Sequence, residues 1–134
     1  MDWNECTKKR TAKETKKDIN LIKSMKEIAE IKIKSADSLS EELFIGKITL
    51  LYDALREYLE CLALEEGYKI YNHECYTPFL KEILKLSTEA EIFDKLRKIR
   101  NGINYYGRKV SKEEAEQIIN DLMGLIQKFK MLRA

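Results

Sequence analysis

The chain has 134 residues, a formal net charge of +2, 36% charged and 44% hydrophobic residues, one proline and five glycines. This balance excludes a disordered chain and a uniformly basic nucleic-acid coat, and the length suits one domain. Few forced breaks, together with abundant Leu, Ile, Lys and Glu, favour an all-helical protein. No apolar run approaches the roughly 20 residues that a membrane span needs.

The first residues are polar and lysine-rich, and they lack the apolar segment of a signal peptide. We expect residues 1–12 to form a flexible lead-in, in which only Trp3 offers a large side chain for docking. The domain proper then covers residues 13–134. Its first helix is predicted over residues 13–36, with an apolar face formed by Ile22, Met25, Ala29, Ile33 and Ala36.

The clearest helical periodicity lies in residues 41–66, which we predict as the central core helix. A serine before two acidic residues is typical of a helix start, and Gly67 is typical of a helix end. Leu55 lies in the middle of the apolar stripe and is predicted to be fully buried, with Asp53 on the opposite, exposed face. The carboxylates on the outer side are interpreted as solvated surface acids: Glu57, Glu60, Glu65 and Glu66.

An aromatic and polar connector follows, and it contains the only histidine of the chain. We interpret His73 as an ordinary loop residue, although a role as general base or ligand is the alternative. Thr77 before Pro78 is typical of a helix start with proline in the first turn, so a short helix is predicted through about Leu86. Ser87 or Thr88 then begins the next helix.

This fourth helix, ending near Tyr106 or Gly107, carries a stretch from Lys95 to Lys112 that has no acidic residue. Helical spacing divides it into two faces. One face is apolar and is predicted to be buried: Ile92, Leu96, Ile99, Ile103 and Tyr106. The other face is polar: Arg97, Arg100, Asn101 and Asn104.

The polar face contains poor helix formers, and Gly102 in the same stretch costs about 1 kcal/mol relative to alanine. Residues that disfavour a helix indicate a site, although a solvated basic face explains the same pattern. Tyr105 lies at the flank, where it could stack on a base, donate to a phosphate, or serve as a structural anchor. Tyr106 is predicted to belong to the core, with its hydroxyl at the edge.

The last helix is predicted over residues 112–132, capped by Ser111. Five helices joined by short connections predict an up-and-down bundle, and no segment has the pattern of a strand. The three cysteines, Cys6, Cys61 and Cys75, share no metal-ligand spacing. We therefore expect free thiols in a reducing cytoplasm, with no metal and no cofactor.

The order of these features resembles the HEPN superfamily of small helical bundles over about residues 20–130. The resemblance is carried by LLYDALREYLECLALEEG, by the following GYKIYNHE and by LRKIRNGINYYG. It implies a mostly helical fold that often forms dimers. HEPN families include metal-independent ribonucleases, often toxins paired with a small nucleotidyltransferase, and non-catalytic relatives that only bind.

In this resemblance Arg100 matches the motif arginine and Asn101 the polar residue after it. The family histidine has no counterpart, because tyrosines stand at positions 105 and 106, as in archaeal variants whose motif ends in YYG. A tyrosine with a pKa near 10 is a poor general base at neutral pH, and losing general acid–base assistance costs about 10²–10⁴-fold in rate.

Three functions follow as expectations. The first is a degenerate HEPN module that binds RNA, a nucleotide or a protein partner through Arg97, Arg100, Asn101, Asn104, Tyr105 and Tyr106. The second is a metal-independent ribonuclease that uses Arg100 and Asn101, with Tyr105, Tyr106 or His73 replacing the missing histidine. The third is the helical partner subunit of a nucleotidyltransferase. We also expect a homodimer with the Arg100 face at or near the twofold axis, and no membrane association.

Overall fold

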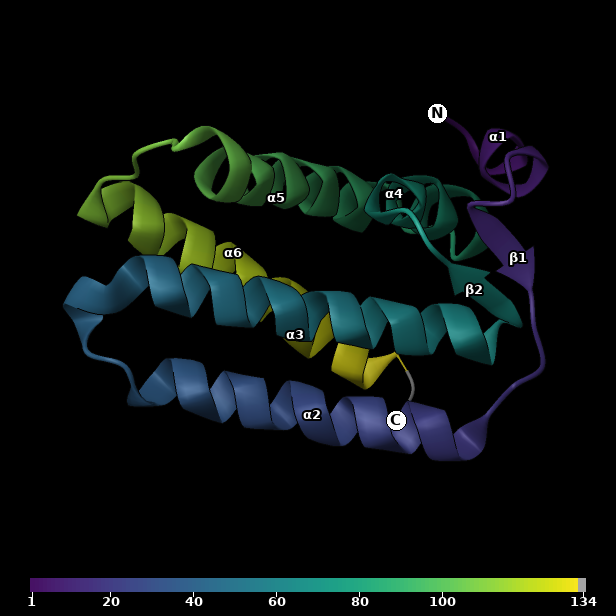
Figure 1. Ribbon diagram of the computed structural model, residues 1–134, viewed down its shortest axis with the longest axis horizontal. Helices are drawn as coiled ribbons and strands as arrows, with labels where there is room; N and C mark the ends of the chain where they lie inside the picture. The colour runs from purple at the N-terminus through teal and green to yellow at the C-terminus, as the bar shows by residue number, and fades with distance from the viewer. Residues whose placement is uncertain (133–134) are drawn as a thin grey trace.

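The computed structural model describes residues 1–132, and the chain is mostly helical, as predicted. Successive long helices run in opposite directions (Figure 1). Helix α3 packs against α2, α5 and α6, so it lies at the centre of the bundle. The long helices are α2 (Ile19–Ser38), α3 (Phe44–Glu65), α5 (Ser87–Tyr106) and α6 (Lys112–Met131).

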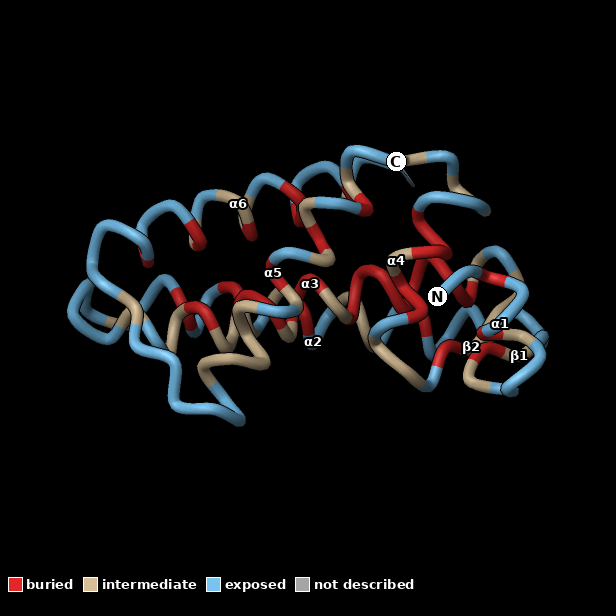
Figure 2. Tube along the Cα trace, turned by 90° about the horizontal axis from the view of Figure 1, so that it is seen from above, coloured by how far each residue is buried: buried red, intermediate tan, exposed pale blue. Residues whose placement is uncertain are grey.

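The core forms around α3, where nearly every side chain from Leu51 to Leu64 is buried (Figure 2). Leu55 has 0% exposure, which confirms its predicted place in the core. The helix ends at Glu65, and Gly67 follows with a φ of +88°, a left-handed conformation that favours glycine. The predicted stop at this glycine is therefore confirmed.

Two acids of α3 are buried rather than solvated, so their interpretation as surface residues is wrong. Glu57 and Glu60 are 5% and 6% exposed. Lys32 of α2 pairs with Glu57, and Lys69 pairs with Glu60. Because α2 and the segment after Gly67 cover the sides of α3 that hold these acids, lysines from both segments neutralise them.

Side-chain caps fix where α2 and α6 begin, whereas α5 begins at Ser87 without a side-chain cap. Asp18 Oδ1 accepts from the Leu21 backbone N–H at 3.0 Å, so α2 begins at Ile19 and not near residue 13. Ser111 Oγ accepts from the Glu114 N–H at 3.2 Å and caps α6, as predicted. Helix α5 ends at Tyr106, and the next residue, Gly107, has a φ of +65° that turns the chain toward α6.

Two short strands form an antiparallel pair, β1 (Ala12–Glu14) with β2 (Tyr68–Ile70), so the expectation of no strand is wrong. The register places Ala12 opposite Ile70 and Glu14 opposite Tyr68. Strands of three residues are too short to show an alternating pattern in the sequence, and their partners lie far apart along the chain.

The expected flexible lead-in forms helix α1 (Trp3–Lys8) followed by β1. Trp3 is 9% exposed, and its ring lies 5.0 Å from the Tyr68 ring and 5.8 Å from the Phe79 ring, measured between centroids.

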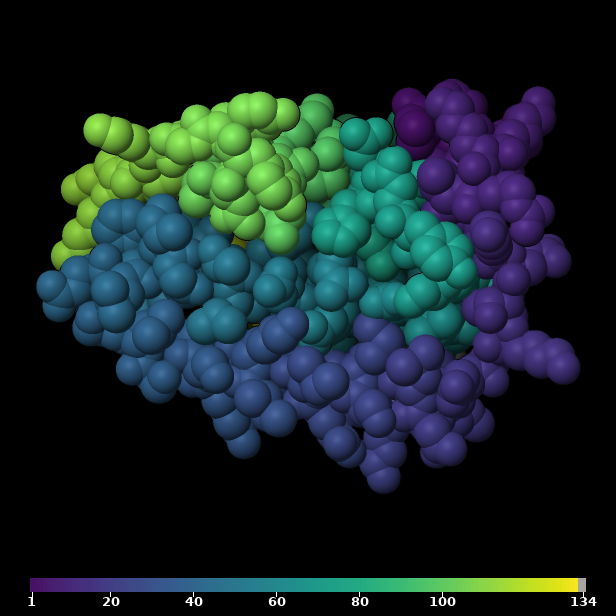
Figure 3. Space-filling model, viewed as in Figure 1, coloured from purple at the N-terminus to yellow at the C-terminus, as the bar shows by residue number. Residues whose placement is uncertain are grey.

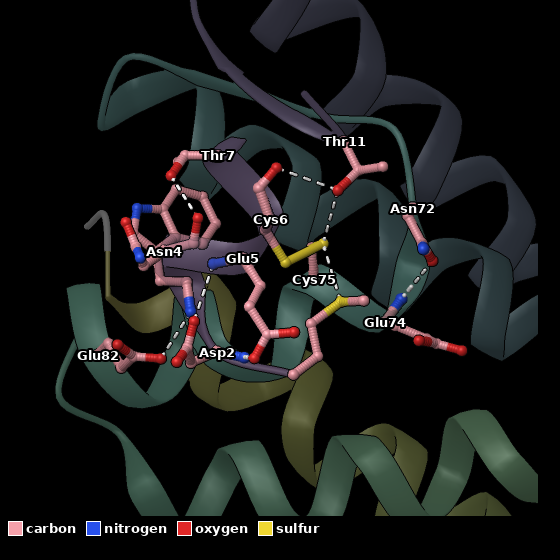
Figure 4. Close-up of a disulfide and its surroundings, with 12 residues drawn as sticks. Asp2, Asn4, Glu5, Cys6, Thr7, Thr11, Asn72, Glu74, Cys75 and Glu82 are labelled. Atoms are coloured by element: carbon pink, nitrogen blue, oxygen red, sulfur yellow. Dashed lines mark hydrogen bonds between the residues drawn. A yellow bond between two sulfur atoms is a disulfide. The ribbon is translucent and has the colours of Figure 1, made fainter. Parts of the chain in front are cut away.

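A disulfide joins Cys6 to Cys75 (Figure 4). The prediction of free thiols is therefore wrong for this pair, which the fold brings together across 69 residues, and Cys61 is the buried free thiol.

Short helical turns replace the single short helix expected between Pro78 and Leu86. Helix α3 is preceded by η1 (Glu41–Leu43), and β2 is followed by η2 (His73–Cys75), α4 (Tyr76–Pro78) and the π-helical η3 (Phe79–Ile83).

None of the helices described combines the length and hydrophobicity that crossing a membrane requires. The disulfide removes the free-thiol argument for a reducing cytoplasm, so that location stays an expectation.

Candidate functional site

The side chain of Arg100 extends from α5 toward α3 and lies between two tyrosines. Its guanidinium carbon is 5.0 Å from the centre of the Tyr52 ring and 5.6 Å from the centre of the Tyr105 ring. Both distances fall within the range of cation–π attraction. The Arg100 Nη1 atom also donates to Asn101 Oδ1 at 3.4 Å and to Tyr105 Oη at 3.3 Å. The structure thus brings together Arg100, Asn101 and Tyr105, the three residues proposed for catalysis.

Arg100 has no carboxylate partner within residues 1–132, unlike Arg56, Arg97 and Arg108. Arg97 binds Asp94 at 2.9 Å, and Arg108 binds Glu114 at 2.9 Å. The Nε atom of Arg100 is buried and finds no hydrogen-bond acceptor among the described residues. A buried donor without an acceptor is costly, by about 1–3 kcal/mol, and such groups call for a functional explanation.

His73 contacts the hydroxyl group of Tyr52. Its Nδ1 atom is 3.4 Å from Tyr52 Oη, and either atom can be the donor. Burial, and then the positive charges of Arg56 and Arg100, lower the pKa of His73, so the imidazole is neutral at pH 7. Burial raises the pKa of Tyr52 to about 12, which keeps its hydroxyl protonated.

Segments far apart in the sequence build this site. Tyr52 comes from α3, His73 from η2 and Arg100 from α5, and these three segments meet on the face shown in Figure 3. We call Tyr52, His73, Arg100, Asn101 and Tyr105 the Arg100 cluster. The cluster offers a partly buried cation, hydroxyl and amide groups, and a neutral imidazole, a combination suited to binding an anion and moving a proton.

Sequence reasoning weighed His73 but left Tyr52 out of the site. The signal was present, because Tyr52 lies four residues after Ile48 and three before Leu55, on the border of the apolar stripe. Its buried position, with 1% exposure, leaves the hydroxyl to find a partner, and that partner is His73. A spacing rule alone could not indicate which distant residue it meets.

The remaining predicted site residues separate from the cluster. The Arg97 side chain is 11% exposed and is held by Asp94, with Glu74 at 4.0 Å, so it connects α5 to η2. Asn104 is exposed. Tyr106 is 84% exposed and its assignment to the core is wrong, because residues 104–106 in the last turn of α5 all face solvent.

No family model matches this chain, and searches of curated proteins and of solved structures return no match. The HEPN resemblance accordingly stands on the sequence features given above and stays a prediction. Within the described residues, no three His, Cys, Asp or Glu side chains gather closely enough to hold a metal ion.

Proposed function

We propose that this protein is a HEPN-like module that binds RNA through the Arg100 cluster, with Arg100 holding a phosphate. The observation that carries the proposal is the partly buried guanidinium that has no carboxylate partner in residues 1–132 and a buried Nε without an acceptor. Guanidinium groups form paired hydrogen bonds with phosphate oxygens, a geometry that lysine cannot reproduce.

The exposed aromatic ring beside this cation favours RNA over an acidic protein partner. Tyr105 is 66% exposed, and its hydroxyl accepts from Arg100. Stacking on an aromatic ring next to a phosphate-binding arginine is a common way to hold an unpaired base. Tyr106, next along the chain and also exposed, offers a second ring.

Binding of a labelled single-stranded RNA, measured by fluorescence anisotropy over a series of salt concentrations, tests this proposal. We expect Arg100→Ala to weaken binding by about 10-fold or more and to reduce the salt slope by about one phosphate contact. Arg100→Lys should recover only part of the loss, since lysine keeps the positive charge but cannot form the paired hydrogen bonds. The melting temperature should stay nearly unchanged.

Lys98→Ala is the matched control, because Lys98 is an exposed cation on the same helix that pairs with Asp94 at 3.0 Å. Equal losses of RNA affinity in Lys98→Ala and Arg100→Ala would mean that RNA binds through general electrostatic attraction and not through a specific Arg100 site. If Arg100→Ala binds RNA as strongly as the wild type but melts several degrees lower, Arg100 is a structural anchor. If the wild type does not bind RNA but captures an acidic protein, the Arg100 cluster is a binding site for a protein partner.

A metal-independent ribonuclease is the second candidate, and the position of His73 favours it. Tyr52 contacts both groups: the His73 imidazole lies at its hydroxyl, and the Arg100 guanidinium lies over its ring. The neutral imidazole would take the proton of a ribose 2′-hydroxyl while that oxygen attacks the phosphorus held by Arg100. The P–O5′ bond breaks, the leaving oxygen takes up a proton, and a 2′,3′-cyclic phosphate forms.

This candidate predicts RNA cleavage in EDTA with cyclic phosphate ends. His73→Ala should slow cleavage by about 10²–10⁴-fold while leaving RNA binding in place. Arg100→Ala should lose both binding and cleavage. Cleavage that continues at full rate in His73→Ala would exclude this mechanism, and binding without cleavage by the wild type would leave the binding function alone.

A further inference from the structure

Helix α2 carries an apolar stripe on the side that faces away from the bundle. Its inner face, which includes Ala29 and Ile33, is buried against the rest of the bundle. On the outer side Leu21, Ile28 and Ile31 are 40%, 47% and 62% exposed. Exposed apolar side chains that line up on one helix face, unlike singly exposed ones, are a feature of interaction surfaces.

The exposed residues follow the alternating three- and four-residue spacing that coiled-coil helices use for contact. Serines occupy the other places of the row and are exposed as well. Small side chains at these places allow the backbone of another helix to come close. The complete row, which we call the α2 stripe, is Leu21, Ser24, Ile28, Ile31, Ser35 and Ser38.

The α2 stripe is complementary to itself when a second α2 runs in the opposite direction. A twofold axis that passes between Ala29 and Glu30 places Ile28 of one copy against Ile31 of the other. The same axis places Ser24 against Ser35, and Leu21 against Ser38. Large side chains thus meet at the centre and a large one meets a small one at each end, which suits close packing across a twofold axis.

Charges beside the α2 stripe select the same arrangement. Glu27 and Lys34 flank it on one side, both are exposed, and neither forms a salt bridge within the described chain. In the antiparallel pair Glu27 faces Lys34 of the second copy, and symmetry repeats the contact. A parallel pair would instead bring Glu27 toward residue 32, on the other flank of the second helix. Lys32, on the opposite flank, already pairs with Glu57.

We propose that the α2 stripe is a homodimer interface, in which α2 packs antiparallel against α2 of a second copy. The twofold axis passes between Ala29 and Glu30. This proposal does not depend on RNA binding, and it moves the axis away from the place expected from the sequence. Helix α2 and helix α5 lie on opposite sides of α3 (Figure 1), so the Arg100 cluster stays open in both copies.

Sedimentation equilibrium of the full chain tests the interface. We expect a dimer for the wild type, and at least about a 10-fold higher dissociation constant for Ile28→Asp and for Ile31→Asp. Ile19→Asp is the matched control, because Ile19 is 71% exposed at the start of the same helix but lies off the α2 stripe. A monomeric wild type, or a dimer that Ile28→Asp leaves intact, would overturn the proposal.

Charge reversal and cross-linking test the direction of the helices. Glu27→Lys and Lys34→Glu should each weaken the dimer several-fold, and the double variant should recover, since the pair is only exchanged. Chains with Ser24→Cys mixed with chains with Ser35→Cys should form cross-links between the two kinds of chain under mild oxidation. Cross-links between two Ser24→Cys chains, or a double variant weaker than either single one, would contradict the antiparallel arrangement.

Discussion

Arg100 has tyrosine rings around its guanidinium where the other paired arginines of the bundle have carboxylates. The rings attract the cation without neutralising it. The positive charge therefore acts on neighbouring groups. Burial lowers the pKa of His73 most, and the positive charges of Arg56 and Arg100 lower it further. A phosphate bound at Arg100 would cancel part of this effect.

The titration of His73 gives a prediction at the same scale. Because burial, Arg56 and Arg100 lower its pKa in the folded protein, the unfolded chain binds this proton more tightly. The free energy of unfolding should therefore fall as the pH drops below about 6.5, the ordinary histidine pKa, and level off below the folded pKa. Urea denaturation across this pH range measures it.

His73→Gln serves as the control for this pH dependence, since glutamine cannot take up the proton. In Arg100→Ala the pKa of His73, followed by NMR, should rise but stay below its ordinary value, because burial remains. An unchanged pKa would separate the imidazole from the cation and weaken the ribonuclease candidate.

Leu55 and Asp53 test the register of the core helix. Leu55 is fully buried, so Leu55→Ala should lower the free energy of unfolding by about 2–5 kcal/mol. Asp53 is partly exposed, and its only salt bridge within residues 1–132, to Lys32, spans 4.0 Å. Asp53→Ala should therefore change the free energy of unfolding by no more than about 0.5 kcal/mol. Similar losses from both variants, measured by chemical denaturation, would contradict this register.

At the scale of elements, the long helices could be predicted because each keeps an apolar stripe over many turns. Ser111 and Gly67 fixed two ends correctly through local chemistry. The start of α2 was misplaced because Asp18, and not the lysine-rich segment before it, supplies the cap. The strands and the disulfide could not be predicted, since each depends on a partner far along the chain. Helix α1 does carry a local signal, because Asp2 and Glu5 form a capping box at its start.

The candidate site divides in the same way. Arg100, Asn101 and Tyr105 were identified because they lie on one helix, where spacing determines which side chains meet. Tyr52 and His73 reach the same place only through the packing of α3 and η2 against α5. Arg97 shares the spacing of Arg100, but Asp94, three residues before it on the same helix, holds its side chain, a pairing that the spacing itself indicates.

The disulfide between α1 and η2 gives a prediction for these elements. Its removal by Cys6→Ser should lower the free energy of unfolding by about 2–5 kcal/mol, because the open chain gains conformational freedom when unfolded. Hydrogen exchange should speed up most in β1 and its partner β2. Reductant should destabilise the wild type but add nothing to the Cys6→Ser variant; an effect on both would point to another disulfide, formed by Cys61 or by the Cys75 thiol that the substitution frees.

At the scale of the whole molecule, the two proposed interaction sites lie on opposite sides of α3. The Arg100 cluster occupies the side of α5, and the α2 stripe occupies the side of α2 (Figure 1). Two RNA-binding surfaces in one dimer would then face away from each other. A dimer of this kind would hold two RNA segments at once rather than enclose one between its subunits.

The disulfide also changes what a protease can release. Residues 15–18, between β1 and α2, are exposed and include Lys16 and Lys17, while Cys6 and Cys75 lie on opposite sides of this linker along the chain. After a tryptic cut there, the N-terminal peptide should stay attached through sulfur, and the mass should rise by one water. Only after reduction should the peptide separate, so electrophoresis with and without reductant would reveal a nicked protein that still moves as one molecule.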